Sequence, residues 1–255
     1  MSAYSLERTQ DGSFTLRSLE LDQACHSNSG AWLEARERYA IPCRVRERSR
    51  CTARLRVLDI GTGPGWNVAG LLEAVADGDA EVDVVSLESD PEVFQLGDAC
   101  VAEDVSGGGS WLGVARTALT ASAERAGEPV AWSGLKLAGK ARLLFGDARE
   151  TLAELGSEEQ FDAVFLDPFS PAKAPQLWEA EFLSEIARRM RAGALLSTYT
   201  TSLAVRAKLR ATGLEVGPGP RVGEKHQGTL ASQGVGLDAF DARTERKLRS
   251  RLARL

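Results

Sequence analysis

The sequence predicts an α/β fold built on a mostly parallel sheet with helices on both faces. Strand-like and helix-like segments alternate five or six times, the pattern of parallel strands joined by helical crossovers. Two apolar runs, one within Val57–Asn67 and one within Phe161–Trp178, each lead to a carboxylate and then to a loop rich in Gly or Pro. Ligands bind at the carboxyl ends of strands in open parallel sheets. These two loops are therefore the expected site.

Short apolar runs predict the strands of this sheet. They are RLRVLDIG (54–61), EVDVVSLE (81–88), ARLLFGD (141–147), FDAVFLD (161–167) and GALLSTYT (193–200), with shorter pieces at 213–217 and around 228–232. Residues 1–25 alternate weakly between apolar and polar side chains. They predict a hairpin or edge strands.

Local start and stop signals predict the helices. Pro91 falls at a first-turn position after Asp90, Ser29 is the expected N-cap of a short helix, and Asp77-Gly78 ends the first crossover helix. A turn is expected at 191–193. The helices are expected at 29–40, 66–76, from 91 onward, 148–155, 177–190, 203–211 and 243–255.

The chain divides into a core and three additions. Residues 1–50 are expected to form an N-terminal extension, 51–235 the α/β domain, and 236–255 a basic C-terminal helix. A Gly-Gly-Gly-Ser break and a further helical pattern predict an insertion over about 105–139.

Composition favours an ordinary globular protein. The 255 residues are 43% hydrophobic and 26% charged. No apolar run approaches the roughly 20 residues that span a bilayer, and the first residues lack the apolar core of a signal peptide, so a cytoplasmic location is expected. Four cysteines without CxxC spacing and two histidines predict neither a metal site nor a disulfide framework.

Charge is unevenly distributed along the chain. The net charge of −5 argues weakly against a nucleic-acid partner, and no Lys or Arg occurs from Val57 to Ala115. In contrast, Arg residues are dense between Arg36 and Arg56, and the tail from Ala242 is basic. Either segment is a polyanion-binding face or an ordinary solvated surface, and the sequence leaves both interpretations open.

The glycine loop after the first core strand indicates a nucleotide-like cofactor. Gly61, Gly63 and Gly65 alternate in this loop, where glycine lets a backbone approach a ligand closely. No Gly-Lys-Ser/Thr follows, which excludes a P-loop. Asp59, two positions before the first glycine, would repel a pyrophosphate.

Carboxylates at the ends of successive strands narrow the choice of cofactor. Glu88 ends the second core strand, where an acid commonly accepts ribose hydroxyls, although a solvated Glu would look the same. Asp147 follows Phe145 and Gly146, and its carboxylate could accept a hydrogen bond from an adenine amino group. Together with Asp59 these acids favour S-adenosyl-L-methionine over NAD, because S-adenosyl-L-methionine carries no phosphate and is cationic at its methionine end.

The alternation and the acids look like a Rossmann-like class I methyltransferase, and one motif is more specific. FLDPFSPAKAPQLW (165–178) resembles the FLDxFxPxKNPxxW signature of the MnmC-type methyltransferase domain. The family's G-x-G-x-N ending falls on Gly63, Gly65 and Asn67, and His26–Tyr39 resembles the preceding segment of its stand-alone members. The resemblance implies methylation of the exocyclic aminomethyl group on the wobble uridine of tRNA, with S-adenosyl-L-methionine as cofactor and the anticodon region as partner.

The chain departs from the family pattern in two places. Ala174 replaces the usual Asn, and the basic ending of the family appears only as RVGEKHQGTL, with Arg221 and Lys225 as looser counterparts. The resemblance is to members without the flavin-dependent oxidoreductase domain. It therefore implies separate oxidoreductase or modification enzymes upstream.

The resemblance and the chemistry assign roles to the second loop. Only a neutral amine attacks a sulfonium methyl, and Asp167 could bind and orient the acceptor ammonium as the catalytic residue; alternatively it is a turn residue before Pro168. Phe169, Lys173, Trp178 and Lys225 are the expected substrate-binding residues. For Trp178 a core anchor at the start of a helix is favoured over base stacking, and Lys173 could equally be solvated.

Two alternative functions remain open at this stage. The first is an N-methyltransferase or aminopropyltransferase-like enzyme for a small amine, which the acidic net charge suggests. The second, from another class, is a non-catalytic cofactor- or RNA-binding module, which the intact Asp167 opposes.

Overall fold

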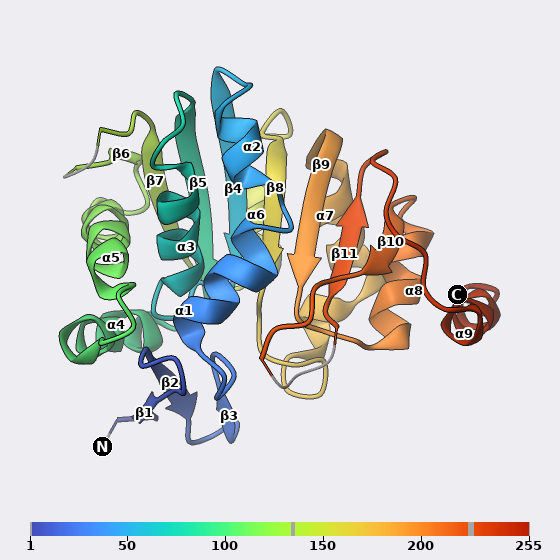
Figure 1. Ribbon diagram of the computed structural model, residues 1–255, viewed down its shortest axis with the longest axis horizontal. Helices are drawn as coiled ribbons and strands as arrows, with labels where there is room; N and C mark the ends of the chain where they lie inside the picture. Colours follow the sequence, from blue (N-terminus) through green and yellow to red (C-terminus); the bar gives the residue numbers. More distant parts are fainter. Residues whose placement is uncertain (1, 134–135, 224–226, 255) are drawn as a thin grey trace.

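The structure is a computed structural model that describes residues 2–133, 136–223 and 227–254. An eight-stranded sheet, in the order β10-β11-β9-β8-β4-β5-β7-β6, forms its centre (Figure 1). A three-stranded sheet, β1-β2-β3, lies below it in that view. The strands are β1 (Tyr4–Arg8), β2 (Phe14–Ser18), β3 (Gln23–Ala24), β4 (Arg54–Ile60), β5 (Glu81–Glu88), β6 (Val130–Ala131), β7 (Lys140–Phe145), β8 (Phe161–Leu166), β9 (Met190–Thr198), β10 (Glu215–Pro218) and β11 (Thr229–Ser232).

The centre of the large sheet is parallel. β4 pairs in parallel with β5 on one side and β8 on the other, and β7 and β9 extend the parallel pairing outward. β6, β10 and β11 are antiparallel additions at the edges. The predicted mostly parallel α/β fold is therefore confirmed, and β4, β5, β7 and β8 end at the same edge.

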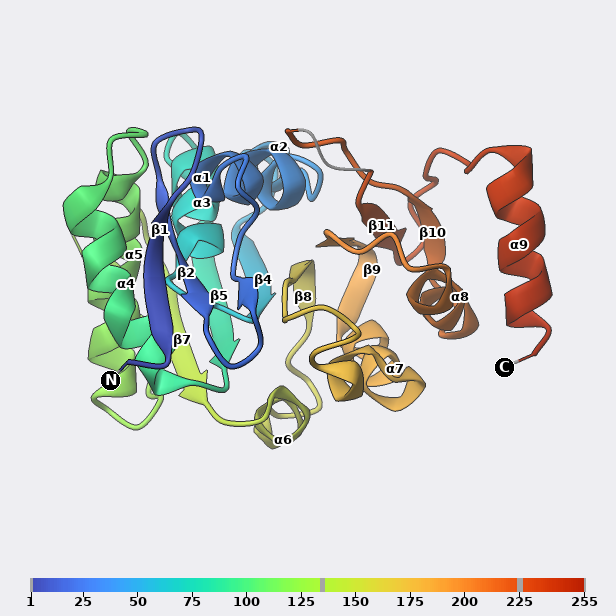
Figure 2. The ribbon, with the colours of Figure 1, turned by 90° about the horizontal axis from the view of Figure 1, so that it is seen from below.

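Helices cover both faces of this sheet (Figures 1 and 2). They are α1 (Ala31–Glu34), η1 (Ala35–Ala40, a π-helix), α2 (Val45–Ser49), α3 (Trp66–Val75), α4 (Pro91–Glu103), α5 (Gly109–Ala123), α6 (Ala148–Glu154), η2 (Pro175–Trp178, a 3₁₀ turn), α7 (Ala180–Arg188), α8 (Leu203–Ala211) and α9 (Ala242–Leu252). Among the described residues, no helix is long and apolar enough to cross a membrane.

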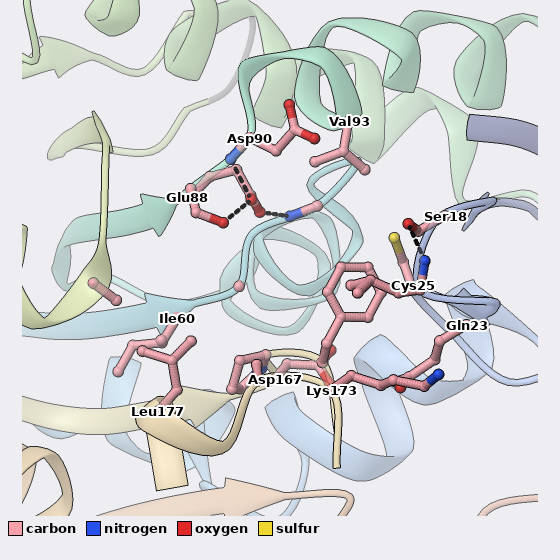
Figure 3. A pocket seen from close by; sticks show the side chains of 18 of the residues that line it. Ser18, Gln23, Cys25, Ile60, Glu88, Asp90, Val93, Asp167, Lys173 and Leu177 are labelled. Atoms are coloured by element: carbon pink, nitrogen blue, oxygen red, sulfur yellow. Dashed lines mark hydrogen bonds between the residues drawn. The ribbon is translucent and has the colours of Figure 1, made fainter. Parts of the chain in front are cut away.

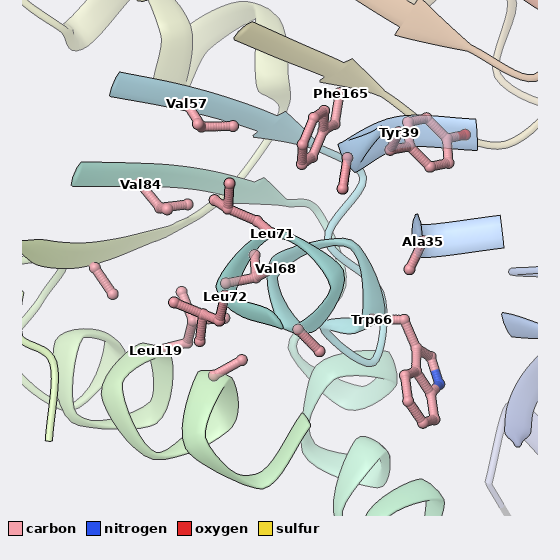
Figure 4. Packing of buried hydrophobic residues seen from close by; sticks show 14 of the residues in the cluster. Ala35, Tyr39, Val57, Trp66, Val68, Leu71, Leu72, Val84, Leu119 and Phe165 are labelled. Atoms are coloured by element: carbon pink, nitrogen blue, oxygen red, sulfur yellow. The ribbon is translucent and has the colours of Figure 1, made fainter. Parts of the chain in front are cut away.

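Each face has its own apolar core. On one face α3 packs between the sheet, η1 and α5, with Leu71, Leu72 and Trp66 fully buried (Figure 4). On the other face the side chains of α6, α7 and α8 pack against β8 and β9. The helical part of the expected insertion, α5, thus contributes to a main core, where it contacts α3, α4 and β7.

The N-terminal residues form the expected hairpin and extend it with β3. This small sheet packs against α4, and the Tyr4 hydroxyl donates to the Asp90 carboxylate at 2.6 Å. The hairpin therefore lies over the loop that follows β5, at the edge where the parallel strands end.

The expected N-cap at Ser29 is wrong. Gly30 occupies the cap position, with φ +151° and no capping side chain of its own. The hairpin supplies the caps instead: the Ser13 hydroxyl accepts from the N–H of Ala31 at 2.9 Å, and the Asp11 carboxylate accepts from Leu33 at 2.8 Å. A tertiary contact thus replaces the local cap that the sequence suggested.

Two further local expectations are corrected. The helix expected over 177–190 is split, because Glu179 is extended (φ −79°, ψ 158°) between η2 and α7. The turn expected at 191–193 lies inside β9, where the pairing with β8 shifts register after Phe161 and Gly193 takes φ +82°.

Candidate active site

A cavity of about 360 Å³ opens at the carboxyl edge of the parallel strands (Figure 3). Its walls come from the loops after β4, β5, β7 and β8, and from the hairpin sheet. The sequence brings these loops together because parallel strands joined by right-handed crossovers end at one edge.

The glycine loop forms the floor of the cavity. Gly61 and Gly63 line it. Both have a positive φ (+81° and +52°), a backbone conformation that residues other than glycine rarely adopt. A Cβ at Gly61 would lie 2.6 Å from the carbonyl oxygen of Asp167, so the first loop touches the second. Gly65 (φ +104°) starts α3 and does not line the cavity.

Glu88 is buried at the end of β5 and braces the glycine loop. Its carboxylate accepts from the N–H of Gly63 at 2.7 Å and from the N–H of Asp90 at 3.0 Å (Figure 3). Burial raises the pKa of this carboxyl, and those backbone donors oppose the rise. The Ser89 hydroxyl also donates to Oε1, at 3.4 Å, so the remaining lone pair for a hydroxyl group of a ligand is on Oε2.

Asp147 lines the same cavity from the loop after β7. It caps α6 by accepting from the N–H of Arg149 at 2.9 Å, and it pairs with the Arg149 guanidinium. The Arg149 guanidinium holds the pKa of this carboxyl below its usual value. Val93 and Ala148 give the neighbouring wall an apolar surface.

Asp59 lies behind the glycine loop and is fully buried, outside the set of lining residues. The Ser86 hydroxyl donates to it at 3.1 Å. Burial raises its pKa to about 7. The geometry makes Asp59 a support for the loop. It does not give Asp59 direct contact with a ligand in the cavity.

Asp167 follows β8 and faces the cavity opposite Glu88 (Figure 3). The Asn67 side-chain amide donates to its carboxylate at 2.9 Å. The hydroxyl of Tyr39 also lies close, without a strictly aligned hydrogen bond. Burial raises the pKa of Asp167 well above its usual range, and Tyr39 and Asn67 oppose that rise.

Two aromatic side chains hold the backbone of the Pro-rich loop that follows Asp167. The Trp178 indole donates to the Phe169 carbonyl at 2.9 Å, and the Tyr199 hydroxyl donates to the Pro168 carbonyl at 2.8 Å. Phe169 and Lys173 line the cavity, whereas Trp178 is 2% exposed and does not. Trp178 is therefore placed as a core anchor. Lys225 lies outside the described residues.

A second chamber, of about 180 Å³, adjoins the first at Asp167. Asp167, Tyr199, Gln23, Cys25 and His26 line both. Glu34 of α1 and Arg38 of η1 also line the second chamber and give it a polar wall. The two chambers therefore share one carboxylate, as a cofactor site and an acceptor site would.

Several lining residues carried no clear sequence signal. Gln23 and Cys25 come from the hairpin, and only tertiary packing brings that segment over the cavity. Glu34 and Arg38, in the second chamber, lie within the His26–Tyr39 segment that resembles the family, but nothing in that charged segment singled out these two residues. Tyr199 had a usable signal, because it follows β9 next to the strand that carries Asp167.

Comparisons with known proteins agree with this arrangement. Residues 129–234, which include Asp147 and Asp167, match a family described as S-adenosyl-L-methionine-dependent methyltransferase. The crystal structure of MNMC2 from Aquifex aeolicus superposes with a TM-score of 0.77 at 27% identity, covering 98% of this chain and 76% of that one.

Curated relatives match over shorter parts. A Ralstonia nicotianae protein named tRNA 5-methylaminomethyl-2-thiouridine biosynthesis bifunctional protein MnmC is 44% identical over 90 residues, 35% of this chain and 13% of that protein. An uncharacterized protein of Methanocaldococcus jannaschii is 27% identical over 230 residues, 89% of this chain and 58% of its own length. The chain thus spans less than two thirds of these relatives.

Proposed function

We propose that this chain, which belongs to the S-adenosyl-L-methionine-dependent methyltransferases of the MnmC type, methylates the exocyclic aminomethyl group of a tRNA wobble uridine. The observation that carries the proposal is Asp167, a buried carboxylate shared by a cofactor-sized cavity and a second chamber. The intact carboxylate and the open chambers do not favour a non-catalytic module.

The first cavity suits S-adenosyl-L-methionine. Gly63 leaves room for close approach to the backbone, and Gly61 lets the first loop pack against the backbone of Asp167. Glu88 offers its carboxylate to the ribose hydroxyls, and Asp147 lies where an adenine amino group could donate. When bound, the cofactor supplies an electrophilic methyl group on a sulfonium. No phosphate has to be accommodated beside Glu88 and Asp167, which would repel one.

Asp167 prepares the acceptor amine. An aliphatic ammonium has no free electron pair, so a proton must leave before the nitrogen can attack a methyl group. A buried carboxylate with a raised pKa can hold the ammonium and accept that proton. Asn67 fixes one carboxylate oxygen at 2.9 Å, which orients the group for in-line transfer.

The C-terminal helix is the better candidate for binding the RNA backbone. Within the described part of α9 and its end, Arg243, Arg246, Lys247, Arg249, Arg251 and Arg254 are exposed and form no ion pair with a described carboxylate. Glu245 pairs with Arg210, and Leu248 is buried, so one face docks while the basic face stays outward. Phosphate contacts of this kind are sequence-independent.

The arginine-dense stretch before β4 is less suitable. Arg46 and Arg50 approach Asp77, and Arg54 pairs with Glu81. Moreover β4 begins at Arg54, so the Arg46–Arg54 part of this stretch lies at the sheet edge opposite to Asp167. Its charge is largely compensated locally.

The test is methyl transfer from labelled S-adenosyl-L-methionine to tRNA that carries the aminomethyl group but lacks the final methyl. We expect label in the wobble nucleoside after digestion of the tRNA. The matched control is tRNA that already carries the methyl. Transfer to small amines with none to either tRNA would overturn the RNA substrate and favour a small-amine methyltransferase.

A further inference from the structure

The second chamber has a polar wall that the proposed methyl transfer does not use. Glu34, at the end of α1, and Arg38, in η1, both line it and are 6% and 1% exposed. Charged side chains this deeply buried are rare unless they are paired or bind something. Glu34 and Arg38 pair with each other only at 3.5 Å, longer than an ordinary hydrogen bond, so the pair keeps bonding capacity for a ligand.

Glu34 is held in place and keeps bonding capacity. One oxygen accepts from the N–H of Ser27 at 2.8 Å, and the other lies 3.5 Å from Nε of Arg38. A carboxylate has about four lone-pair sites, so the oxygen facing Arg38 can accept a further N–H.

Arg38 is incompletely satisfied. Its Nε and Nη1 have no hydrogen-bond partner among the described residues, although the side chain is almost fully buried. Buried N–H groups that make no hydrogen bond are costly, and the Glu34 carboxylate pairs with Nε only at 3.5 Å, so a bound acceptor oxygen would relieve that cost. The wall thus presents one acceptor and one unsatisfied donor side by side.

We propose that Glu34 and Arg38 recognise the imide edge of the target pyrimidine. Uracil presents an N3–H donor flanked by carbonyl (or thiocarbonyl) acceptors, the complement of a carboxylate beside a guanidinium. The inference rests on the proposed function, in which the acceptor is a base taken out of a single-stranded loop.

The dimensions of the site agree with a single base. The chamber, at about 180 Å³, is smaller than the roughly 300–1,000 Å³ of sites for drug-sized ligands. Asp167 lines both this chamber and the cofactor cavity, so a 5-substituent on a base in the chamber would extend toward Asp167. Reading the imide edge would place the opposite side of the ring, which carries position 5, toward the cofactor.

The experiment compares two acceptors with the full-length protein. One tRNA carries 5-aminomethyluridine at the wobble position, and the other carries its N3-methyl derivative, which lacks the N3–H. We expect kcat/KM of the native protein to be about 5- to 150-fold lower on the N3-methyl tRNA, the loss typical of one removed base contact. Cofactor affinity, measured by calorimetry, should not depend on the tRNA.

Glu34→Gln tests the assigned residue. The amide oxygen can still accept from Ser27, but the side chain now also carries donors, so the preference for N3–H over N3-methyl should shrink toward one. Glu37→Gln is the matched control, because Glu37 lies on η1 outside both chambers and the native preference should persist.

The outcomes separate this inference from the function on which it rests. Equal activity of the native protein on both tRNAs, or an unchanged preference in Glu34→Gln, overturns the base-reading role and leaves the methyltransferase assignment standing. If Glu34→Gln does not fold, the native comparison alone decides. No transfer to either tRNA, with cofactor bound, overturns the proposed function as well.

Discussion

Asp167 is the residue on which the proposed chemistry depends. Asp167→Asn keeps the shape and can still accept from Asn67, but it cannot take the acceptor proton. We expect methyl transfer to fall about 10²- to 10⁴-fold, the usual contribution of a positioned base, with cofactor affinity within a few fold. Single-turnover assays and calorimetry measure the two quantities.

Asp162→Asn is the control for that substitution. Asp162 lies on the same strand near its other end, where it pairs with Arg191. The control should keep its activity. A parallel loss of cofactor binding and activity in Asp167→Asn would instead make Asp167 a cofactor ligand.

Asn67 is one of two side chains that lower the pKa of Asp167 against the effect of burial. The amide of Asn67 opposes the rise in the pKa of the Asp167 carboxyl, so Asn67→Ala should raise that pKa further. A base must be deprotonated to act, so the acid limb of the kcat/KM profile should move to higher pH. The rate should fall most at low pH and recover as the pH rises.

The acceptor amine titrates identically with both proteins, so the difference between the two pH profiles reports on the enzyme. A profile that falls uniformly at every pH, without a shifted limb, would show that Asn67 acts only through packing.

The loop between β4 and α3 is the element most sensitive to a single methyl group. Gly61→Ala has two effects: it puts a side chain on a residue with positive φ, and its Cβ would lie 2.6 Å from the carbonyl oxygen of Asp167. We expect weaker cofactor binding and lower activity together, because both loops must shift. Gly213→Ala is the matched control: φ is +91°, but no atom of the described residues lies within 4 Å of the added Cβ.

Comparing these two variants separates backbone strain from steric contact. Strain alone costs about 1–3 kcal/mol in the free energy of unfolding, and both variants should show it in urea titrations. Only Gly61→Ala should lose cofactor affinity. Equal cofactor affinity in both variants would contradict the assigned contact between the two loops.

Some element boundaries followed from local signals and others did not. Pro91 and its Asp90 cap fixed the start of α4, since the signal and the structure are both local. The start of α1 was missed, because its caps, Ser13 and Asp11, come from the distant hairpin.

At the scale of the whole molecule, the exposed basic face of α9 should dominate RNA affinity. Arg246→Gln combined with Arg249→Gln should weaken tRNA binding and flatten the slope of log affinity against log salt by about one to two. Filter binding at several salt concentrations measures this slope.

Arg46→Gln combined with Arg50→Gln is the matched control, because it removes the same charge from a patch that already faces Asp77. We expect little change in its slope. Should the two double variants behave alike, net charge rather than the α9 face would account for RNA binding.

The sequence alone determined the parallel α/β plan and the strand ends that carry Asp59, Glu88, Asp147 and Asp167. Continuous apolar runs and glycine spacing are local properties, and parallel topology then brings strand ends to one edge. It also indicated the cofactor class, through acids where a phosphate would be repelled.

Only the tertiary structure decided which of these residues face the cavity. Asp59 and Trp178 lie behind the loops, and Glu34 and Arg38 of the second chamber come from a segment in which the sequence marked no individual site residue. Burial of a charged side chain depends on what packs over it, here a hairpin distant in sequence from the core strands. No local sequence pattern shows which charged side chains become buried, because the segments that pack over them depend on the whole fold.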